Sequence, residues 1–357
     1  MDVSAEITGL KYKPYLTREL KSYLFQSIGE ALKQQGAFLI TFKSQNQLAV
    51  SWWVSPKRTR SYPYARVYDT LSFPGRKITI IPVYKDEGAD GDRDFLQWDT
   101  VSLMSLLGVY VIISYYDNAE RNINYKNKIT NQRFAINHIL REINKLLSYQ
   151  SDALHWNLEQ LEQVGIIAHR ALRAYKTISE QTGVQMHSTE SAQKIISELS
   201  RGRENFIAAS RTKAQHAQYR ESVTIQPKES VSGKKATLTI RNYLGGMYYF
   251  TCDEVELRDR KIRLIECKHS RNNVIPSIDD IKDGLLKMIL LVNLKNVRIG
   301  DQKYLPSPML KLTSGCQFKP QALKPHQRDI LKLLKQEAQS NNFSILLNGK
   351  NLSHLAI

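Results

Sequence analysis

Residues 247–270 read MYYFTCDEVELRDRKIRLIECKHS, and this stretch decides the fold that the sequence predicts. Its first half alternates and is rich in Tyr, Phe, Thr and Val, whereas its second half is an apolar run interrupted by Glu266 and Lys268. Both compositions are typical of β-strands, and the polar RDRK between them is typical of a tight turn. The stretch therefore predicts a β-hairpin.

The predicted hairpin gathers charged side chains on one face. If the turn is centred on the middle two residues of RDRK, Asp253 faces Glu266 across the two strands. Lys268 is two residues after Glu266 and shares its face, whereas Glu254 points to the other face. The same register places Cys252 opposite Cys267, away from the carboxylates.

Two carboxylates that face each other across a strand pair repel, and a divalent cation between them removes the conflict. Mg²⁺ is usually held by one or two carboxylates, with water and phosphate oxygens completing its shell. A lysine beside such a metal can orient or deprotonate a water, or neutralise charge that develops on a phosphate. The alternative interpretation is an exposed hairpin face that carries scattered charges.

An Asp on the first strand followed by Glu-x-Lys on the second resembles the PD-(D/E)XK nuclease superfamily, in particular its type II restriction endonucleases. The resemblance covers roughly residues 190–300 and implies that Asp253 and Glu266 bind Mg²⁺ while Lys268 assists the attacking water. Cys252 stands where the family often has Pro. In many related nucleases the helix before the first catalytic strand adds a third acid, and the candidates here are Glu198, Glu204 and Glu221.

The composition favours a polyanionic partner. The chain has 357 residues, with 51 Lys and Arg against 34 Asp and Glu, so its formal net charge is +17. Such an excess favours nucleic acid, here double-stranded DNA, although high charge also serves solubility. The sequence contains no long apolar run and no apolar signal-peptide core, so neither a membrane span nor secretion is expected. Three cysteines without a Cys-x-x-Cys pair suggest free thiols in a reducing cytoplasm.

The chain is expected to have an α/β fold in three parts. Residues 1–128 alternate strand and helix patterns, which predicts an N-terminal α/β domain with a parallel crossover and a possible DNA-binding role. Residues 129–187 look helical, which suggests a connector or a dimerisation arm suited to a palindromic target. Residues 188–357 are expected to form a restriction-endonuclease-like mixed-sheet core with a C-terminal extension. The acidic stretch DEGADGDRD at 86–94 is expected to be a solvated loop.

Two basic segments are candidate DNA contacts. In the first, basic residues alternate with Tyr62, Tyr64 and Tyr68, which could stack on nucleic acid, although an exposed loop is equally consistent. In the second, Arg and Gln recur at helical spacing, as base-reading side chains would, although a solvated amphipathic helix has the same pattern. The candidate residues are Lys57, Arg58, Arg60, Arg201, Arg203, Arg211, Lys213 and Gln215.

The sequence therefore predicts a Mg²⁺-dependent type II restriction endonuclease that hydrolyses phosphodiester bonds in double-stranded DNA, and a homodimer is expected. The alternatives are a repair, recombination or mobile-element nuclease of the same fold, and a DNA-binding protein without catalytic activity. The chain has no G-x-x-x-x-G-K-[ST] phosphate loop, which favours a nuclease that acts without ATP.

Overall fold

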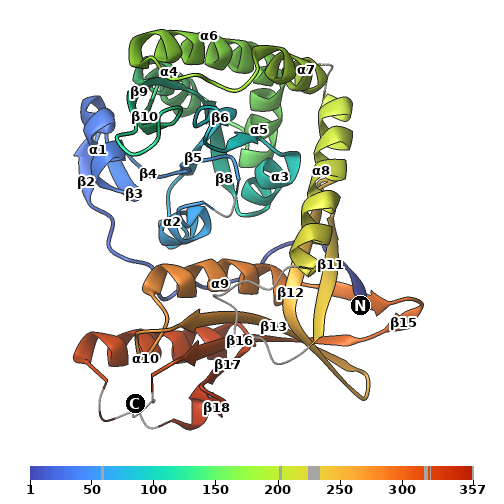
Figure 1. Ribbon diagram of the computed structural model, residues 1–357. Helices are drawn as coiled ribbons and strands as arrows, with labels where there is room; N and C mark the ends of the chain where they lie inside the picture. Colours follow the sequence, from blue (N-terminus) through green and yellow to red (C-terminus); the bar gives the residue numbers. More distant parts are fainter. Residues whose placement is uncertain (58–59, 201–202, 224–233, 317–320, 322, 356–357) are drawn as a thin grey trace. The chain divides into compact units, whose positions relative to one another are not determined.

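The structure is a computed structural model that describes the chain except residues 58–59, 201–202, 224–233, 317–320, 322 and 356–357. At several positions between 195 and 234 it describes the backbone alone. The fold is mixed α/β, as expected, with parallel and antiparallel strand pairs (Figure 1). In the described part of the chain, no helix combines the length and the apolar character that crossing a bilayer requires.

The chain forms two compact units that differ from the expected three-part division. Unit 1 joins Met1–Glu19 to Lys213–Ile357, and unit 2 is Leu20–Thr212. The expected boundaries after residues 128 and 187 both fall inside unit 2, so residues 129–187 are not a separate connector. Sequence proximity is a poor guide here because the N-terminal strand pairs with strands more than two hundred residues later.

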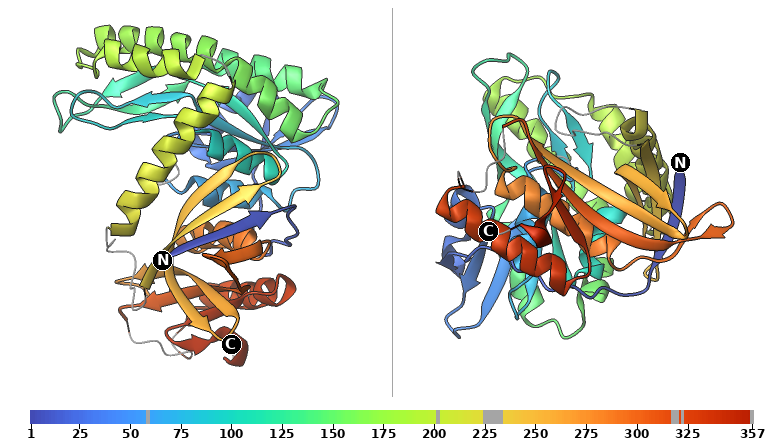
Figure 2. Two further views of the ribbon diagram at one scale, coloured as in Figure 1. Left: turned by 90° about the vertical axis from the view of Figure 1, so that its right-hand side faces the viewer. Right: turned by 90° about the horizontal axis from the view of Figure 1, so that it is seen from below.

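Unit 1 is built on a nine-stranded sheet in the order β15-β14-β1-β11-β12-β13-β16-β17-β18 (Figure 2). Its strands are β1 (Asp2–Ile7), β11 (Lys234–Asn242), β12 (Met247–Arg258), β13 (Lys261–Ser270), β14 (Lys295–Ile299), β15 (Gln302–Lys303), β16 (Leu305–Ser314), β17 (Ser344–Leu347) and β18 (Lys350–Asn351). Its other elements are α9 (Ile278–Leu291), α10 (Pro325–Ser340), the short η3 (Leu352–His354) and the C-terminal part of α8 (Arg203–Val223).

The N-terminal segment belongs to unit 1 because both its strand and the loop after it are bound there. Strand β1 runs parallel to β11 and buries alternate apolar side chains. Further along, the buried carboxylate of Glu337 in α10 accepts hydrogen bonds from the Tyr12 hydroxyl and from the backbone N–H groups of Tyr15 and Leu16, at 2.7, 3.0 and 3.1 Å. A buried charge with three donors is well satisfied, so this contact fixes the path of the segment.

The hairpin of β12 and β13 has the predicted turn and register from Arg258–Lys261 to Glu254–Ile265. Asp259 in the turn has a left-handed φ of 54°, which Asp tolerates better than most residues. Beyond Glu254 the two strands separate: β12 continues to pair with β11, and β13 pairs with β16. A bulge in β12 accompanies the separation, because Lys234 pairs with Val255 whereas Ala236 pairs with Cys252.

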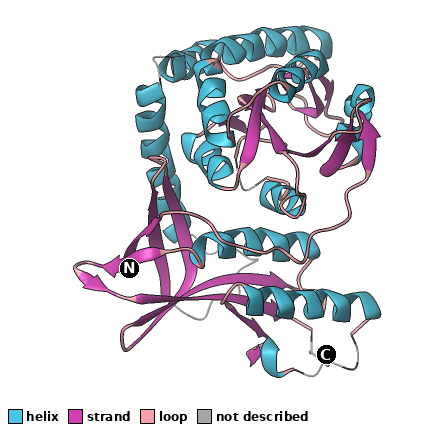
Figure 3. Ribbon diagram, turned by 180° about the vertical axis from the view of Figure 1, so that it is seen from behind, coloured by secondary structure: helices cyan, strands magenta, loops and turns pink. Residues whose placement is uncertain are grey.

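The strands after the hairpin are connected by helices that return to the same sheet. Between β13 and the parallel strand β16, the chain forms helix α9 and the strands β14 and β15. Helix α10 connects β16 to the parallel strand β17 (Figure 3). Helix α9 contacts both β13 and β16. Its start is fixed by Ser277, whose hydroxyl accepts a hydrogen bond from the backbone N–H of Asp280 at 3.1 Å.

Unit 2 contains a five-stranded sheet in the order β2-β3-β4-β5-β8 and two two-stranded sheets, β6-β7 and β9-β10. The predicted parallel crossover from β5 through α3 to β8 is confirmed, but residues 129–134 form a strand where a helix was predicted. The elements of this unit are β2 (Ser22–Leu24), η1 (Phe25–Ser27), α1 (Ile28–Gln34), β3 (Ala37–Thr41), β4 (Gln47–Trp52), α2 (Pro63–Thr70), β5 (Lys77–Pro82), β6 (Tyr84–Asp86), β7 (Arg93–Phe95), α3 (Trp98–Leu106), β8 (Val109–Ser114), β9 (Tyr116–Arg121), β10 (Ile129–Phe134), α4 (Ile136–Leu147), α5 (Ala153–Glu162), α6 (Val164–Thr182), α7 (Thr189–Ser200) and the N-terminal part of α8.

Candidate functional site

Asp253 is located where β12 and β13 separate. Its side chain is buried, and its Oδ2 accepts a hydrogen bond of 2.7 Å from the backbone N–H of Cys267. This hydrogen bond satisfies a backbone N–H group of β13 that lies just beyond Glu254–Ile265, the last residue pair of the β12–β13 ladder. The carboxylate therefore lies beside the peptide that joins Glu266 to Cys267.

Glu266 is buried between two lysines. The ammonium of Lys268 is 3.0 Å from its Oε1, and the ammonium of Lys287 in α9 is 2.8 Å from its carboxylate oxygens. Burial acts to raise the pKa of Glu266, but the charges and hydrogen bonds of Lys287 and Lys268 outweigh it and hold the pKa below its usual value. Glu266 is therefore ionised at neutral pH.

Lys268 bridges two acids, as its ammonium also donates to Oδ2 of Asp283 in α9 at 2.8 Å. Burial acts to lower the pKa of Lys268, but Glu266 and Asp283 together raise it above its ordinary value. Lys268 is thus a fixed positive charge, suited to stabilising negative charge rather than to accepting a proton in this arrangement. Helix α9 comes close to it at Gly284, where an added Cβ would be 3.3 Å from Lys268 Cε and 2.8 Å from Leu310 Cδ1.

The two cysteines on the hairpin do not face each other as predicted. Cys252 lines a small cavity together with Glu266 and Lys287, whereas Cys267 packs in an apolar cluster with Ile265. The bulge in β12 accounts for the difference, because one extra residue reverses the alternation of the strand. Burial and the nearby charges of the acidic residues on β12 and β13 raise the pKa of both thiols.

Glu254 forms a separate ion pair. Its carboxylate binds the ammonium of Lys311 in β16 at 2.7 and 3.0 Å, and Lys311 is the register partner of Cys267. Glu254 therefore belongs with Cys267 rather than with Lys268 and α9. This agrees with the prediction that it points away from Glu266 and Lys268.

The donor set of the hairpin suits a hard cation, because Asp253 and Glu266 are buried carboxylates on adjoining strands. Burial, together with the charges of Asp253 and Glu266, raises the pKa of the Cys252 thiol. Within the described part of the chain, no three or more His, Cys, Asp and Glu side chains form a group able to hold a metal. A cation held by these two acids would therefore need water or substrate oxygens as its remaining ligands.

Sequence reasoning missed Asp283 and favoured an exposed Lys287 over one that approaches phosphate, whereas α9 brings both residues to the hairpin. Their four-residue spacing places both on one side of a helix, and that spacing was a usable signal. The structure describes only the backbone at the three candidates for a third acid, which are Glu198, Glu204 and Glu221.

The candidate DNA contacts are dispersed. Lys57 is exposed, Arg211 is half-buried, and Gln215 is exposed with its amide donating to the Tyr249 hydroxyl at 3.2 Å. Arg60 is engaged within unit 2 by the carboxylates of Glu87, Asp92 and Asp94. Arg58 and Arg201, and the side chains of Arg203 and Lys213, lie outside the described residues.

Two groups of side chains singled out for nucleic acid are structural. Tyr64 and Tyr68 are buried in α2, a helix that begins at Pro63, so neither the exposed loop nor the stacking on nucleic acid considered for them is observed. Gln218 on α8 is also buried, and its amide donates to the carbonyls of Leu238 and Phe250 at 3.2 and 2.9 Å. Neither tyrosine nor Gln218 is therefore available to a nucleic acid.

Comparison with known proteins gave no further information on the site, since no family model, curated protein or solved structure matches this chain.

Proposed function

We propose that this protein is a Mg²⁺-dependent DNA endonuclease whose site is Asp253, Glu266 and Lys268, completed by Asp283 and Lys287. The observation that carries the proposal is the buried, alternating-charge cluster in which Lys268 bridges Glu266 and Asp283. Holding several charges in the interior is costly unless they are mutually paired, so such clusters are often functional. The hairpin motif that resembles restriction endonucleases supports the proposal, together with Asp283 and Lys287, which α9 adds to the cluster.

In this proposal Asp253 and Glu266 hold the metal. A Mg²⁺ ion held by these two residues would polarise the scissile phosphate and lower the pKa of a bound water. The charged Lys268 stabilises the negative charge that develops on the phosphate when water attacks and a P–O bond breaks. Asp283 positions Lys268, and Lys287 offsets the charge of Glu266 when the metal is absent.

Double-stranded DNA is the proposed substrate because the chain carries a formal charge of +17. Binding is expected to weaken steeply with salt, since neutralised phosphates release counterions. Sequence-specific cleavage by a homodimer, as in a type II restriction enzyme, is the finer form of the proposal. Discrete bands from a digested plasmid would support it, whereas a smear would favour a nuclease of another purpose.

The test is a plasmid digestion with purified protein, in Mg²⁺ and in EDTA. Asp253→Ala and Lys268→Ala are expected to abolish cleavage while DNA binding by gel shift is retained. Glu256→Ala is the matched control, because this exposed carboxylate lies on the same strand and pairs only with Arg263 among the described residues. Wild-type cleavage by either site variant would refute the assignment. Binding without cleavage by the wild type would favour a DNA-binding protein.

A further inference from the structure

Unit 2 contains a cavity of about 920 Å³ that the proposed nuclease site does not use. Ligand sites commonly have volumes of roughly 300–1,000 Å³, so this cavity has room for a small molecule. It lies between the β9–β10 hairpin, the end of β4 and helix α1. All of its lining residues belong to unit 2.

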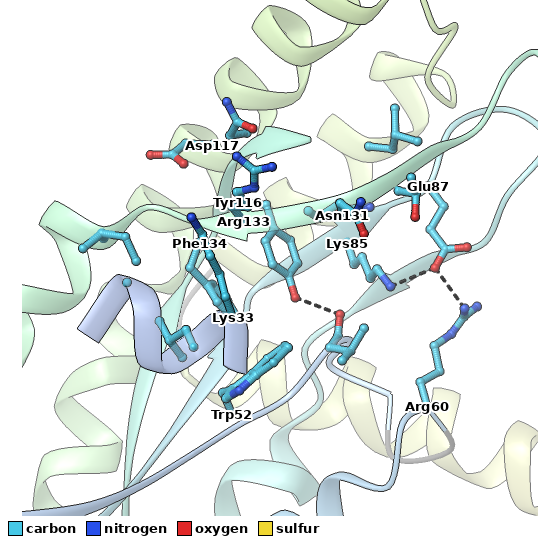
Figure 4. Close-up of a pocket in the computed structure, with 18 of the residues that line it drawn as sticks. Lys33, Trp52, Arg60, Lys85, Glu87, Tyr116, Asp117, Asn131, Arg133 and Phe134 are labelled. Carbon is cyan, nitrogen blue, oxygen red and sulfur yellow. Dashed lines mark hydrogen bonds and ion pairs between the residues drawn. The ribbon is translucent and has the colours of Figure 1, made fainter. Parts of the chain in front are cut away.

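One wall of the cavity is aromatic (Figure 4). Phe134 stacks on Tyr116 with ring centroids 4.4 Å apart, and Trp52 meets Phe134 edge-on at 5.9 Å. The tryptophan is fixed, because its Nε1 donates to the carbonyl of Gln35 at 2.7 Å and the guanidinium of Arg66 lies 4.3 Å from its ring. A rigid aromatic wall favours a flat apolar or heterocyclic group as ligand.

Another wall of the cavity holds Glu87 with Lys85 and Arg60 beside it (Figure 4), and Lys128 is a third cation at this acid. Lys85, Arg60 and Lys128 lie 2.8, 3.1 and 3.3 Å from the carboxylate of Glu87. Burial acts to raise the pKa of Glu87, but its hydrogen bond and charge contact with Lys85, supported by Arg60 and Lys128, lower the pKa to about 2. The acidic stretch expected to be a solvated loop is thus part of a buried ion-pair cluster.

Lys85 can bind an anionic group in this cavity. Arg60 is already matched, since Asp92 and Asp94 bind it from outside the cavity. Lys85 is 6% exposed, and Glu87 is its only polar side-chain partner among the described residues. An ammonium has three donors, so Lys85 keeps donors for a ligand. Over the whole cavity, the charged lining residues are five cations and two acids: Lys33, Arg60, Lys85, Lys128 and Arg133 against Glu87 and Asp117.

We propose that this cavity binds a nucleoside monophosphate unit, with the base against Trp52 and Phe134 and the phosphate at Lys85 and Lys128. A flat base and a single anionic phosphate match the two walls, and stacking on aromatic side chains is a general way of holding unpaired bases. Two sources share this chemistry: a free mononucleotide, and an unpaired nucleotide of a DNA strand. The site lies in unit 2, so it is a function additional to cleavage.

The test measures binding by the full chain in EDTA, where metal-dependent cleavage does not occur. The probes are the four 2′-deoxynucleoside 5′-monophosphates by calorimetry, and a short single strand and its duplex by fluorescence anisotropy. Lys85→Met and Lys128→Ala are expected to weaken binding by about tenfold or more, because each removes a charged donor. Lys176→Ala is the matched control, an exposed lysine on α6 of the same unit.

A second kind of variant narrows the cavity without removing a charged group. Gly29 lines the cavity within α1, and a Cβ there meets only Ile136, at an ordinary 3.6 Å. Gly29→Leu narrows the cavity and raises helix propensity, so it is expected to weaken binding while the protein stays folded by circular dichroism.

If the wild type binds mononucleotides and these variants do not, the ligand is a free mononucleotide. Strand binding alone, lost in the same variants, identifies an unpaired nucleotide. The proposal is overturned if no probe binds the wild type at millimolar concentration, or if the variants bind like the control. Because cleavage is not measured, this failure would leave the nuclease proposal unaffected.

Discussion

Replacing Glu87 with Gln tests whether the buried cluster of unit 2 stabilises the fold as its geometry implies. Glu87 accepts from three cations and is 8% exposed. Its pKa falls from 4.5 to about 2 in the folded state. Each pKa unit corresponds to about 1.4 kcal/mol, so the ionised carboxylate contributes about 3 kcal/mol to the free energy of unfolding at neutral pH.

The sign of the pH dependence follows from the depressed pKa. The contribution is fully present above the unfolded pKa of 4.5 and is lost as pH falls toward the folded value of about 2. The difference in unfolding free energy between wild type and Glu87→Gln is expected to be about 3 kcal/mol at neutral pH and roughly half of that near pH 3.

The assay is urea unfolding followed by tryptophan emission. All four tryptophans, at positions 52, 53, 98 and 156, lie in unit 2, so the signal reports this unit. Glu180→Gln on α6 is the control, because its carboxylate is exposed. The reasoning would be refuted if the loss of unfolding free energy in Glu87→Gln were the same at both pH values. It would also be refuted if that loss were no larger than the loss in the control.

Three further predictions concern unit 1. Gly284→Ala should cost about 1–3 kcal/mol of stability and slow any cleavage, because its Cβ would be 2.8 Å from Leu310 Cδ1; an unchanged urea midpoint by circular dichroism would contradict this. Glu337→Gln should cost about 2 kcal/mol or more, because its carboxylate accepts three hydrogen bonds from residues 12–16; a limited proteolysis pattern identical to wild type would count against it. Of the three thiols in the native protein, only Cys316, which is partly exposed, should react quickly with a thiol reagent, because the other two are buried; three fast thiols would disprove the burial.

The sequence alone determined the hairpin up to the pair Glu254–Ile265, but not the predicted pairing of Asp253 with Glu266 beyond it. Alternating β-formers on both sides of a polar turn fix the strands, and the turn position fixes the register from Arg258–Lys261 to Glu254–Ile265. The position of α9 was also predictable, because its N-cap and its apolar spacing are local signals. These features depend on residues that are close together in the chain.

Tertiary structure decided which side chains meet at the site. The bulge that moves Cys252 to the side of Glu266 exists because β12 must also pair with β11, a demand that the hairpin sequence does not contain. Asp283 and Lys287 reach the cluster only because α9 returns across β13, and β1 joins the sheet from the other end of the chain.

The acidic stretch at 86–94 shows the same limit in unit 2. Its composition is that of a solvated loop, and charged residues are normally exposed. Cations from distant positions, Arg60 and Lys128, nevertheless pair with Glu87 and make its burial favourable. Local sequence sets which conformations a segment prefers, whereas the balance of burial and pairing depends on partners that only the folded chain brings together.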